Sequence, residues 1–406
     1  MRILIISQYF WPEPFIINDL ARTLAAAGHE IVVATGKPNY PTGKIAPGYH
    51  RRGLQRETYG GAVEVIRVPL RPRGRAGAIA LSLNYLSFVL SSLQHLPRLF
   101  RGRSFDAILV FCVSPITAAI PALVLKRQMG AHLALWIQDL WPESVAATGF
   151  VRNRVILKAL ELIVRLIYRG ADTLLVQSEA FIGPISRHVE PQKIVYYPNF
   201  APSLPAEKSA LPSRIHELFD GHFCVVFAGN LGKAQSLETI TAAARLLLGT
   251  PAIRILVAGT GSEASWLKAT AADQDLRNIH LLGKLDVELM PELFARADAL
   301  LVTLRDDEAL NATVPSKIQA YMSAGKPIVG ALNGEGARLI ESSKAGLTVC
   351  AGDAAGLAAR ILTLHEMSST TRATMGRAAK AHFDANFEVG RAAERLVEIL
   401  QARMRG

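Results

Sequence analysis

The strongest candidate for chemistry is a predicted helix start at Pro315-Ser316-Lys317. A predicted strand and an acidic loop precede it, and proline suits the first position of a helix, which leaves Ser316 and Lys317 in the first turn. Gly325 and Pro327 end the helix. A helix start offers unpaired N–H groups and partial positive charge, so a hydroxyl and an ammonium there favour phosphate binding. The alternative is an ordinary strand–helix unit whose lysine is simply exposed.

Three further turns follow predicted strands of the same half and could contact a nucleotide diphosphate. Their candidate residues are Gly229, Asn230, Gly232 and Lys233 in the first turn, Gly261 in the second, and Lys284 and Leu285 in the third. Glycine lets a backbone approach a ligand closely, and the amide and ammonium groups can reach phosphate oxygens. A lone Gly-x-Gly is most often only a turn. Several such turns at one sheet edge, together with the helix start, favour a diphosphate site.

Other nucleotide chemistries lack their motifs. The turn after the first strand, residues 7–14, has no Gly-x-Gly-x-x-Gly, and no Gly-x-x-x-x-Gly-Lys loop occurs, so dinucleotide redox chemistry and phosphoryl transfer are disfavoured. Cys112, Cys224 and Cys350 show no metal-ligand spacing, and we expect them to be reduced core residues. We therefore predict neither a metal nor a cofactor.

The elements that must position these residues alternate between buried strands and helices. The length of 406 residues favours two or three domains, and the pattern predicts mostly parallel sheets covered by helices. Residues 201–213 are rich in Pro, Ala and Ser and are predicted to be a linker. Because a strand already begins at Arg2, we expect no signal peptide. Two α/β halves joined by a linker make an interdomain cleft the expected site.

The positive charge belongs entirely to the first half. Residues 1–200 hold 23 Lys and Arg against 12 Asp and Glu, whereas residues 201–406 hold 22 of each. Seven arginines and no acid lie within residues 67–103, at Arg67, Arg71, Arg73, Arg75, Arg98, Arg101 and Arg103. They flank an uncharged segment, 76–97, which predicts an amphipathic helix with a polar stripe at Asn84, Ser87, Ser91 and Gln94. This favours an anionic membrane surface over nucleic acid. The alternative is a core helix with solvated arginines.

Motifs throughout the chain resemble the retaining GT-B glycosyltransferases of family four, in the bacterial branch that builds O-antigen, capsule and colanic-acid-type polysaccharides and includes N-acetyl-L-fucosamine transferases. The motifs are Gln8-Tyr9-Phe10-Trp11-Pro12-Glu13 with Asn18-Asp19-Leu20, Gly28-His29-Glu30, Pro38-Asn39-Tyr40-Pro41-Thr42-Gly43, Gln138-Asp139-Leu140-Trp141-Pro142-Glu143-Ser144, Ala228-Gly229-Asn230-Leu231-Gly232, and Thr313 to Pro327. The resemblance implies two Rossmann-like α/β/α domains facing a cleft. Residues 1–200 would bind the acceptor, 201–385 the donor, and a C-terminal helix, 386–406, would pack back on the first domain.

The resemblance further implies metal-independent transfer, with retention, from a UDP-sugar to a polyprenyl-diphosphate-linked glycan at the inner face of the cell membrane. The catalytic candidates are Lys317, Lys233 and Asp139, with Pro315 and Ser316 beside the donor. Relatives place two glutamates where this chain has Ala312 and Ala320, one of them on the donor ribose. We therefore assign neutralisation of the diphosphate to the lysines and the helix start. The residue that contacts the ribose stays unassigned.

Asn18, Asp139 and Glu143 are the acceptor-binding candidates, and each has a structural alternative as a helix cap or first-turn residue. His29 is expected to be structural, and Asn199 to shape the hinge. Two other functions remain open. A nucleotide-sugar 2-epimerase of similar shape would act on the donor alone. A catalytically silent nucleotide-sugar-binding subunit would explain the two alanines.

Overall fold

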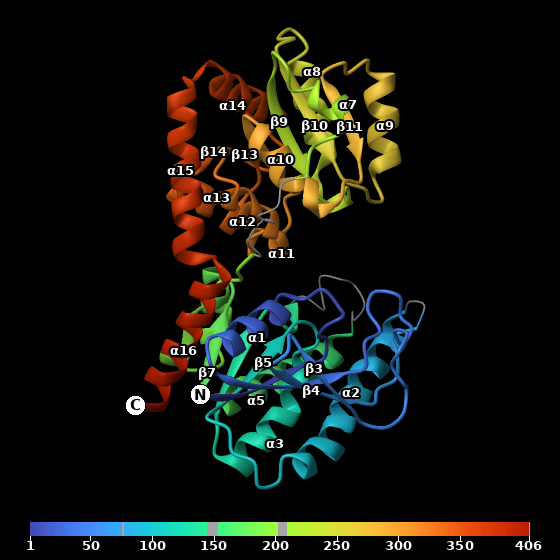
Figure 1. Ribbon diagram of the computed structural model, residues 1–406, viewed down its shortest axis with the longest axis vertical. Helices are drawn as coiled ribbons and strands as arrows, with labels where there is room; N and C mark the ends of the chain where they lie inside the picture. The colour runs from blue at the N-terminus through green and yellow to red at the C-terminus, as the bar shows by residue number, and fades with distance from the viewer. Residues whose placement is uncertain (75–76, 144–152, 202–208, 406) are drawn as a thin grey trace. The chain divides into compact units, whose positions relative to one another are not determined.

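The computed structural model describes residues 1–74, 77–143, 153–201 and 209–405. Its two compact units are Met1–Asn199 together with Val389–Gly406, and Phe200–Glu388 (Figure 1). Arg75, Ser144 and most of the predicted linker, residues 202–208, lie outside the described residues.

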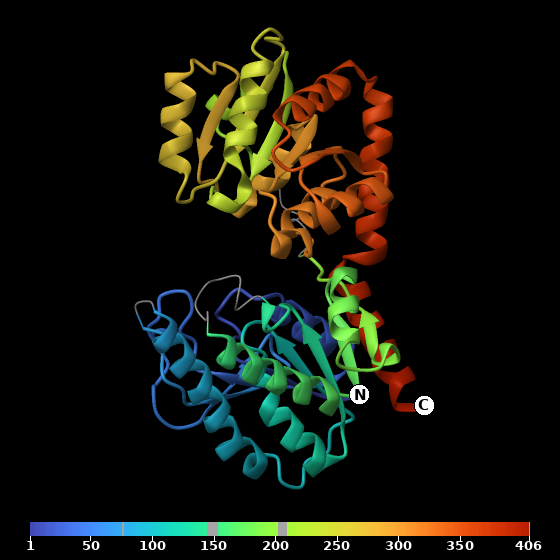
Figure 2. The ribbon, with the colours of Figure 1, turned by 180° about the vertical axis from the view of Figure 1, so that it is seen from behind.

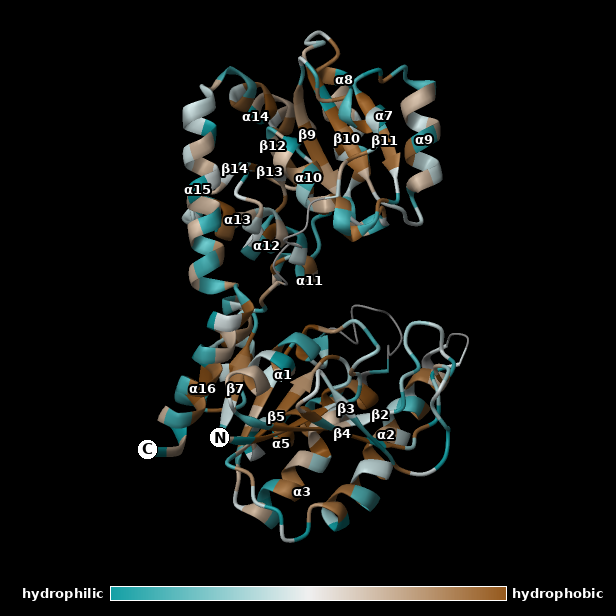
Figure 3. Ribbon diagram, viewed as in Figure 1, coloured by the Kyte–Doolittle hydropathy of each residue, from teal (hydrophilic) through white to brown (hydrophobic). Residues whose placement is uncertain are grey.

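The first unit is built on an eight-stranded sheet with the order β3-β4-β2-β1-β5-β6-β7-β8. Its strands are β1 (Arg2–Ser7), β2 (Glu30–Gly36), β3 (Gln55–Tyr59), β4 (Val63–Val68), β5 (Ala107–Cys112), β6 (His132–Ile137), β7 (Thr173–Val176) and β8 (Ile194–Tyr196). All neighbours pair in parallel except β3 and β4. Because parallel strands are covered on both faces, the central strands are continuous apolar runs (Figure 3).

Helices cover both faces of this sheet. They are α1 (Ile16–Ala26), α2 (Ala78–Leu99), α3 (Ile120–Met129), α5 (Arg154–Gly170), the short α6 (Ile182–Ser186) and α16 (Val389–Arg405). The C-terminal α16 packs against α1, and the Tyr197 hydroxyl donates to the Ala392 carbonyl at 2.8 Å. Helices α2, α3 and α5 pack side by side on one face (Figure 2).

The second unit holds a six-stranded parallel sheet with the order β11-β10-β9-β12-β13-β14. Its strands are β9 (Phe223–Ala228), β10 (Ile253–Ala258), β11 (Ile279–Gly283), β12 (Ala299–Thr303), β13 (Ile328–Ala331) and β14 (Gly346–Val349). Its helices are α7 (Ser213–His216), α8 (Leu237–Leu246), α9 (Ala264–Asp273), α10 (Met290–Arg296), α11 (Glu308–Asn311), α12 (Ser316–Ser323), α13 (Gly334–Ser342), α14 (Ala354–Glu366) and α15 (Ser369–Asn386). The strand order reverses between β9 and β12, and ligands of such sheets bind at the carboxyl ends beside that point.

Two details differ from the expectations. Cys112 and Cys224 are buried, but Cys350 is exposed just after β14, so its prediction as a core residue was wrong. Pro315 lies before α12 in extended conformation, as the N-cap residue, rather than at the first helical position. Gly325 does end the helix, with a left-handed φ of 66°. Among the described residues, no helix is both long and apolar enough to cross a membrane.

Candidate functional site

The three predicted turns of the second unit meet at the carboxyl edge of its sheet. The N–H of Gly229 donates to Ala258 at 2.9 Å, and that of Gly259 donates to Gly283 at 2.8 Å. The N–H of Leu231 donates to the carbonyl of Thr260, and the carbonyl of Leu231 accepts from the N–H of Glu263, both at 2.8 Å. The turns after β9, β10 and β11 are therefore bonded to one another, and Gly229, Asn230, Gly232 and Gly261 lie in one continuous backbone platform.

Two glycines make this platform possible. Gly229 and Gly259 both have φ of 145°, a conformation that residues with a side chain rarely adopt. A Cβ on Gly259 would lie 1.8 Å from the Gly229 carbonyl oxygen, so the two turns touch backbone to backbone. A Cβ on Gly229 would lie 3.5 Å from the Lys317 Nζ atom. The ammonium of Lys317 thus lies directly beside the first turn.

Lys317 is partly buried and has an unusual environment. Its ammonium lies 3.7 Å from the centre of the Phe227 ring and donates to the Gln235 side-chain carbonyl. Among the described residues no carboxylate is within ion-pair distance. Burial lowers the pKa of Lys317 from 10.5 to about 7. A strongly perturbed amine without a counter-ion, beside glycine turns at a sheet edge, is typical of a site that receives an anion.

Residues that the sequence analysis did not single out hold α12 against the sheet. The Tyr321 hydroxyl accepts from the Ala228 N–H at 2.8 Å and donates to the carbonyl of the same residue at 3.1 Å. This fixes the register between α12 and the end of β9, and therefore the distance from Lys317 to Gly229. The hydroxyl of Thr303, at the end of β12, donates to the backbone carbonyl of Gln235. The signal available in the sequence was the tyrosine one helical turn after the lysine.

The other predicted donor residues are arranged around this point. Ser316 and Lys233 are exposed, and among the described residues Lys233 makes no ion pair. Asn230, Lys284 and Leu285 line a pocket of about 320 Å³ with Gly229 and residues from the second turn. Its remaining lining includes the apolar side chains of Val287 and Met290, which the sequence analysis did not assign. Such a pocket of strand-end backbone and apolar side chains could accept a flat ring.

The ribose contact is not explained by the two positions flagged in the sequence. Ala312 is the C-cap residue of α11, and Ala320 lies within α12. Neither side chain can hydrogen-bond. Among the described residues, no group of three or more His, Cys, Asp or Glu side chains is placed to hold a metal ion.

In the first unit, Asp139 follows β6 and is bonded to the loop after β5. Its carboxylate accepts from the Ser114 hydroxyl at 2.7 Å and from the Ser114 N–H at 3.3 Å, and the Trp141 indole donates to the same hydroxyl at 3.1 Å. Both loops lie at the carboxyl edge of the sheet. Glu143 is exposed. Asn199 donates to the side-chain carbonyl of Gln138 at 2.8 Å, which also ties the end of this unit to that edge.

Asn18 is buried and does not cap α1, whose N-cap residue is Phe15. Its amide donates to the Glu13 carbonyl at 2.7 Å and accepts from the Trp11 N–H at 3.0 Å, so it folds the loop after β1 onto the helix. These bonds give a structural role to the side chain that was assigned to the acceptor. The alternative prediction that Asn18 caps the helix was therefore wrong, because Phe15 is the N-cap residue.

Glu13 and its neighbours form a network that the sequence analysis quoted without assigning a role. The buried Glu13 carboxylate accepts from the N–H groups of Asn39 and Tyr40, both at 2.7 Å, and from that of Phe10 at 3.3 Å. Burial raises the pKa of Glu13, and these hydrogen bonds oppose the rise. Glu13 therefore joins the loop after β1 to the loop after β2.

That junction presents a cluster of aromatic rings with one cation. Tyr9 stacks on Phe15 at 5.2 Å between ring centres, and Tyr40 lies 5.4 Å from Phe15. The Arg73 guanidinium lies 5.3 Å from the Tyr40 ring centre and 6.0 Å from that of Tyr9. Tyr40 is 41% exposed. An exposed aromatic ring beside a guanidinium offers an apolar face and hydrogen-bond donors to a sugar.

Two of the arginines predicted to flank α2 are engaged within the protein. Arg67 is fully buried, pairs with Glu57 and donates to the carbonyls of Gly36 and Trp11. Arg103 pairs with Glu64 at 3.0 Å. These two arginines are therefore unavailable to a membrane, whereas Arg71, Arg98 and Arg101 are exposed.

The predicted polar stripe of α2 is wrong at Asn84, whereas Ser87 and Ser91 are half-buried and Gln94 is exposed. Asn84 is fully buried: it accepts from Gln8 at 2.7 Å and donates to the Arg71 carbonyl. The exposed side of α2 also carries apolar side chains, among them Ile79. A polar residue at helical spacing was in this case a core hydrogen-bonding group.

Comparisons with known proteins agree with this architecture. Residues 16–199 match the family described as Glycosyl transferase 4-like domain, and residues 222–367 match the family described as Glycosyl transferases group 1. The chain is 26% identical over 340 residues to a protein of Escherichia coli (strain K12), WcaI, named for glycosyl transfer in colanic acid biosynthesis. That match covers 80% of this chain and 82% of the relative.

A second relative, from Corynebacterium glutamicum, is 28% identical over 213 residues, 51% of this chain and 54% of its own length. It is named a GDP-mannose-dependent monoacylated alpha-(1-6)-phosphatidylinositol monomannoside mannosyltransferase.

Solved structures share the fold. The Anabaena protein HepE in complex with UDP superposes with a TM-score of 0.67 at 16% identity, covering 99% of this chain and all of HepE. The trehalose-6-phosphate protein of E. coli, bound with UDP-2-fluoro glucose, superposes with a TM-score of 0.73 at 14% identity, covering 98% and 99%. The expected GT-B fold is confirmed, and the two matched families identify the chain as a glycosyltransferase of the GT-B type.

Proposed function

We propose that this GT-B glycosyltransferase transfers a sugar from a UDP-linked donor to a growing, polyprenyl-diphosphate-linked glycan of a surface polysaccharide, with retention at the anomeric carbon and without a metal. The donor sugar we propose is an N-acetylated amino sugar such as N-acetyl-L-fucosamine. The observation that carries the donor half of this proposal is the Lys317 ammonium beside Gly229 at the strand-order reversal.

The chemistry follows from charge. Retaining transfer passes through an oxocarbenium-like state while the leaving diphosphate gains negative charge. Fixed donors and cations that face the developing charge supply the largest catalytic effect in such sites. Lys317 donates to Gln235, and Tyr321 fixes its helix to the end of β9, so the ammonium would need little reorganisation when the charge develops. The exposed Lys233 would act as a second cation from the neighbouring turn.

The acceptor half is supported by the first unit's carboxyl edge. Asp139 stands on the loop after β6 with one carboxylate oxygen bonded to Ser114. It would orient the acceptor hydroxyl, and the ring of Tyr40 with Arg73 would hold the preceding sugar. UDP as the nucleotide is supported by the two solved structures with bound UDP compounds, whereas the name of the C. glutamicum relative makes GDP the competing choice.

A panel of UDP- and GDP-sugars tests the donor by thermal shift, because a ligand that binds the folded state raises the melting temperature. We expect a UDP-linked amino sugar to give the largest shift. Incubation with the donor alone then separates the alternatives. A new nucleotide sugar would indicate a 2-epimerase. Tight binding with no reaction, even with acceptor present, would indicate a binding subunit and would fit Ala312 and Ala320. Chelation with EDTA should leave transfer unchanged.

A further inference from the structure

Helix α5 is apolar on two opposite faces. Its inner residues Val164, Ile167 and Tyr168 pack on the sheet and are each about 1% exposed. On its outer side, Val155, Leu162 and Leu166 are 75%, 57% and 59% exposed, and Ile156 and Ile163 are exposed beside them. We call these five outer residues the α5 face. A helix that covers a sheet normally turns polar residues outwards, and a contiguous exposed apolar patch usually marks a contact surface.

Basic side chains follow one edge of the α5 face. Lys158, Arg165 and Arg169 recur at spacings of seven and four residues, which places them on one side of the helix. Glu161 is the single acid of α5. Among the described residues, neither Lys158 nor Arg165 forms an ion pair, so their charges face solvent.

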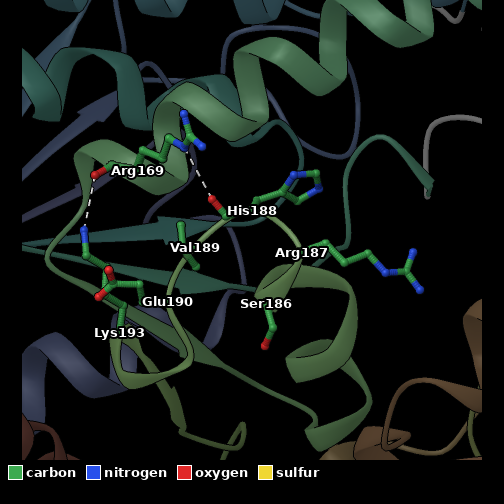
Figure 4. Close-up of a pocket in the computed structure, with 7 residues that line it drawn as sticks. All are labelled: Arg169, Ser186, Arg187, His188, Val189, Glu190 and Lys193. Carbon is green, nitrogen blue, oxygen red and sulfur yellow. Dashed lines mark hydrogen bonds between the residues drawn. The ribbon is translucent and has the colours of Figure 1, made fainter.

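The last turn of α5 leads into a cationic pocket of about 450 Å³ (Figure 4). Arg169, Arg187 and Lys193 line it with one acid, Glu190. The Arg169 Nε donates to the His188 carbonyl at 3.5 Å, and Lys193 donates to the Arg169 carbonyl at 3.3 Å. These bonds fix two cations at the rim and leave guanidinium N–H groups of Arg169 for an anion.

We propose that the α5 face and this pocket dock the first unit on an anionic lipid bilayer. The apolar side chains would enter the boundary between headgroups and acyl chains, and the pocket would receive a lipid phosphate. A basic edge, an apolar face and an adjoining cationic pocket match an anionic bilayer in both charge and polarity.

The surface continues on the neighbouring helices. Ile79, Leu86 and Leu90 of α2 are exposed, and α3, which lies between α2 and α5, exposes Val124 (Figure 2). The proposed membrane contact therefore keeps the apolar side of α2, within the arginine-flanked segment 67–103, and extends from it across α3 to the α5 face. Membrane docking would bring the protein to the lipid-linked acceptor, and in this one respect the inference rests on the proposed function.

Co-sedimentation with phosphatidylglycerol–phosphatidylcholine vesicles, without donor or acceptor, tests this surface. The double variant L162E/L166E should bind at least tenfold more weakly than the parent, because two leucines lose their burial in lipid. The variant K158Q/R165Q should lose about fivefold for each charge and should lose its preference for anionic over pure phosphatidylcholine vesicles. Leu246 of α8 is 58% exposed in the other unit, so L246E is the matched control and should bind as the parent does.

The outcomes separate docking from folding and from the proposed function. L162E/L166E should keep the far-UV circular dichroism and the UDP-sugar affinity of the parent, because the donor site lies in the other unit. Weak vesicle binding with intact donor binding supports the proposal. Equal vesicle binding by L162E/L166E and the parent would overturn it. A parent that ignores vesicles but forms a dimer that L162E/L166E abolishes would also overturn it, since the α5 face would then contact a second copy.

Discussion

Donor binding should weaken as pH rises because Lys317 loses its proton near neutrality. Its folded-state pKa of about 7 lies far below the usual 10.5, so the ammonium is about nine-tenths charged at pH 6 and about one-tenth charged at pH 8. A unit charge about 4 Å from a phosphate gains about 4 kcal/mol at an effective dielectric constant of about 20, which is roughly a thousandfold in affinity. The donor therefore selects the protonated form, and its affinity should fall about tenfold between pH 6 and pH 8.

Isothermal titration calorimetry with a UDP-sugar measures this directly. A UDP-sugar is the appropriate probe because its diphosphate is esterified at both ends and does not titrate in this range. Binding at pH 8 should also take up close to one proton, seen as a dependence of the heat on the ionisation enthalpy of the buffer. Lys317→Met should bind weakly and without pH dependence. Lys233→Met, which removes an exposed cation, should weaken binding but keep the slope.

Equal affinity at pH 6 and pH 8, with no proton uptake, would refute this reasoning. It would mean either that the ammonium stays charged throughout or that it does not face the diphosphate. A slope that persists in Lys317→Met would assign the titration to another group.

Three further predictions concern the supports of the two sites. Gly259→Ala should lower donor affinity more than tenfold and destabilise the second unit by on the order of 1–3 kcal/mol in thermal unfolding, because its Cβ would meet a backbone carbonyl at 1.8 Å. Gly221→Ala, where a Cβ would meet open space, is the control and should leave donor affinity unchanged. Glu13→Ala should reduce the free energy of unfolding by about 2 kcal/mol in urea titrations, since three N–H groups lose their acceptor, and an unchanged midpoint would contradict this. Tyr40→Ala and Arg73→Ala should each raise the acceptor KM several-fold without changing donor affinity, and a matching loss of donor affinity would argue against an acceptor role.

The second unit was largely predictable because local rules and tertiary structure agree there. Apolar strands bounded by glycine turns predicted β9 to β13, and parallel pairing necessarily brings their carboxyl ends to one edge. The helix itself followed from Pro315 and Gly325, although it begins at Ser316, one residue later than predicted. The edge strand β14 was missed because it is only four residues long and partly exposed.

The first unit was less predictable because polar residues there serve the interior. Asn84 fits a polar stripe at helical spacing, yet it is buried. Its hydrogen-bond partner Gln8 lies 76 residues away in the chain. Arg67 was counted as a membrane-facing charge, but its partner Glu57 is on β3, an edge strand of alternating polar residues that carries no apolar signal. The apolar outer side of α5 was missed because α5 is apolar on both sides. Only tertiary packing decides which of the two sides is buried.

The most direct test of the account is transfer itself. The purified protein would be incubated with a UDP-linked N-acetylated amino sugar and a polyprenyl-diphosphate-linked glycan, and both released UDP and the extended lipid-linked product would be measured. The account predicts equal amounts of UDP and product, an anomeric configuration like that of the donor, and a loss of at least a hundredfold in Lys317→Ala. Near-normal turnover in Lys317→Ala would contradict the central role given to that residue.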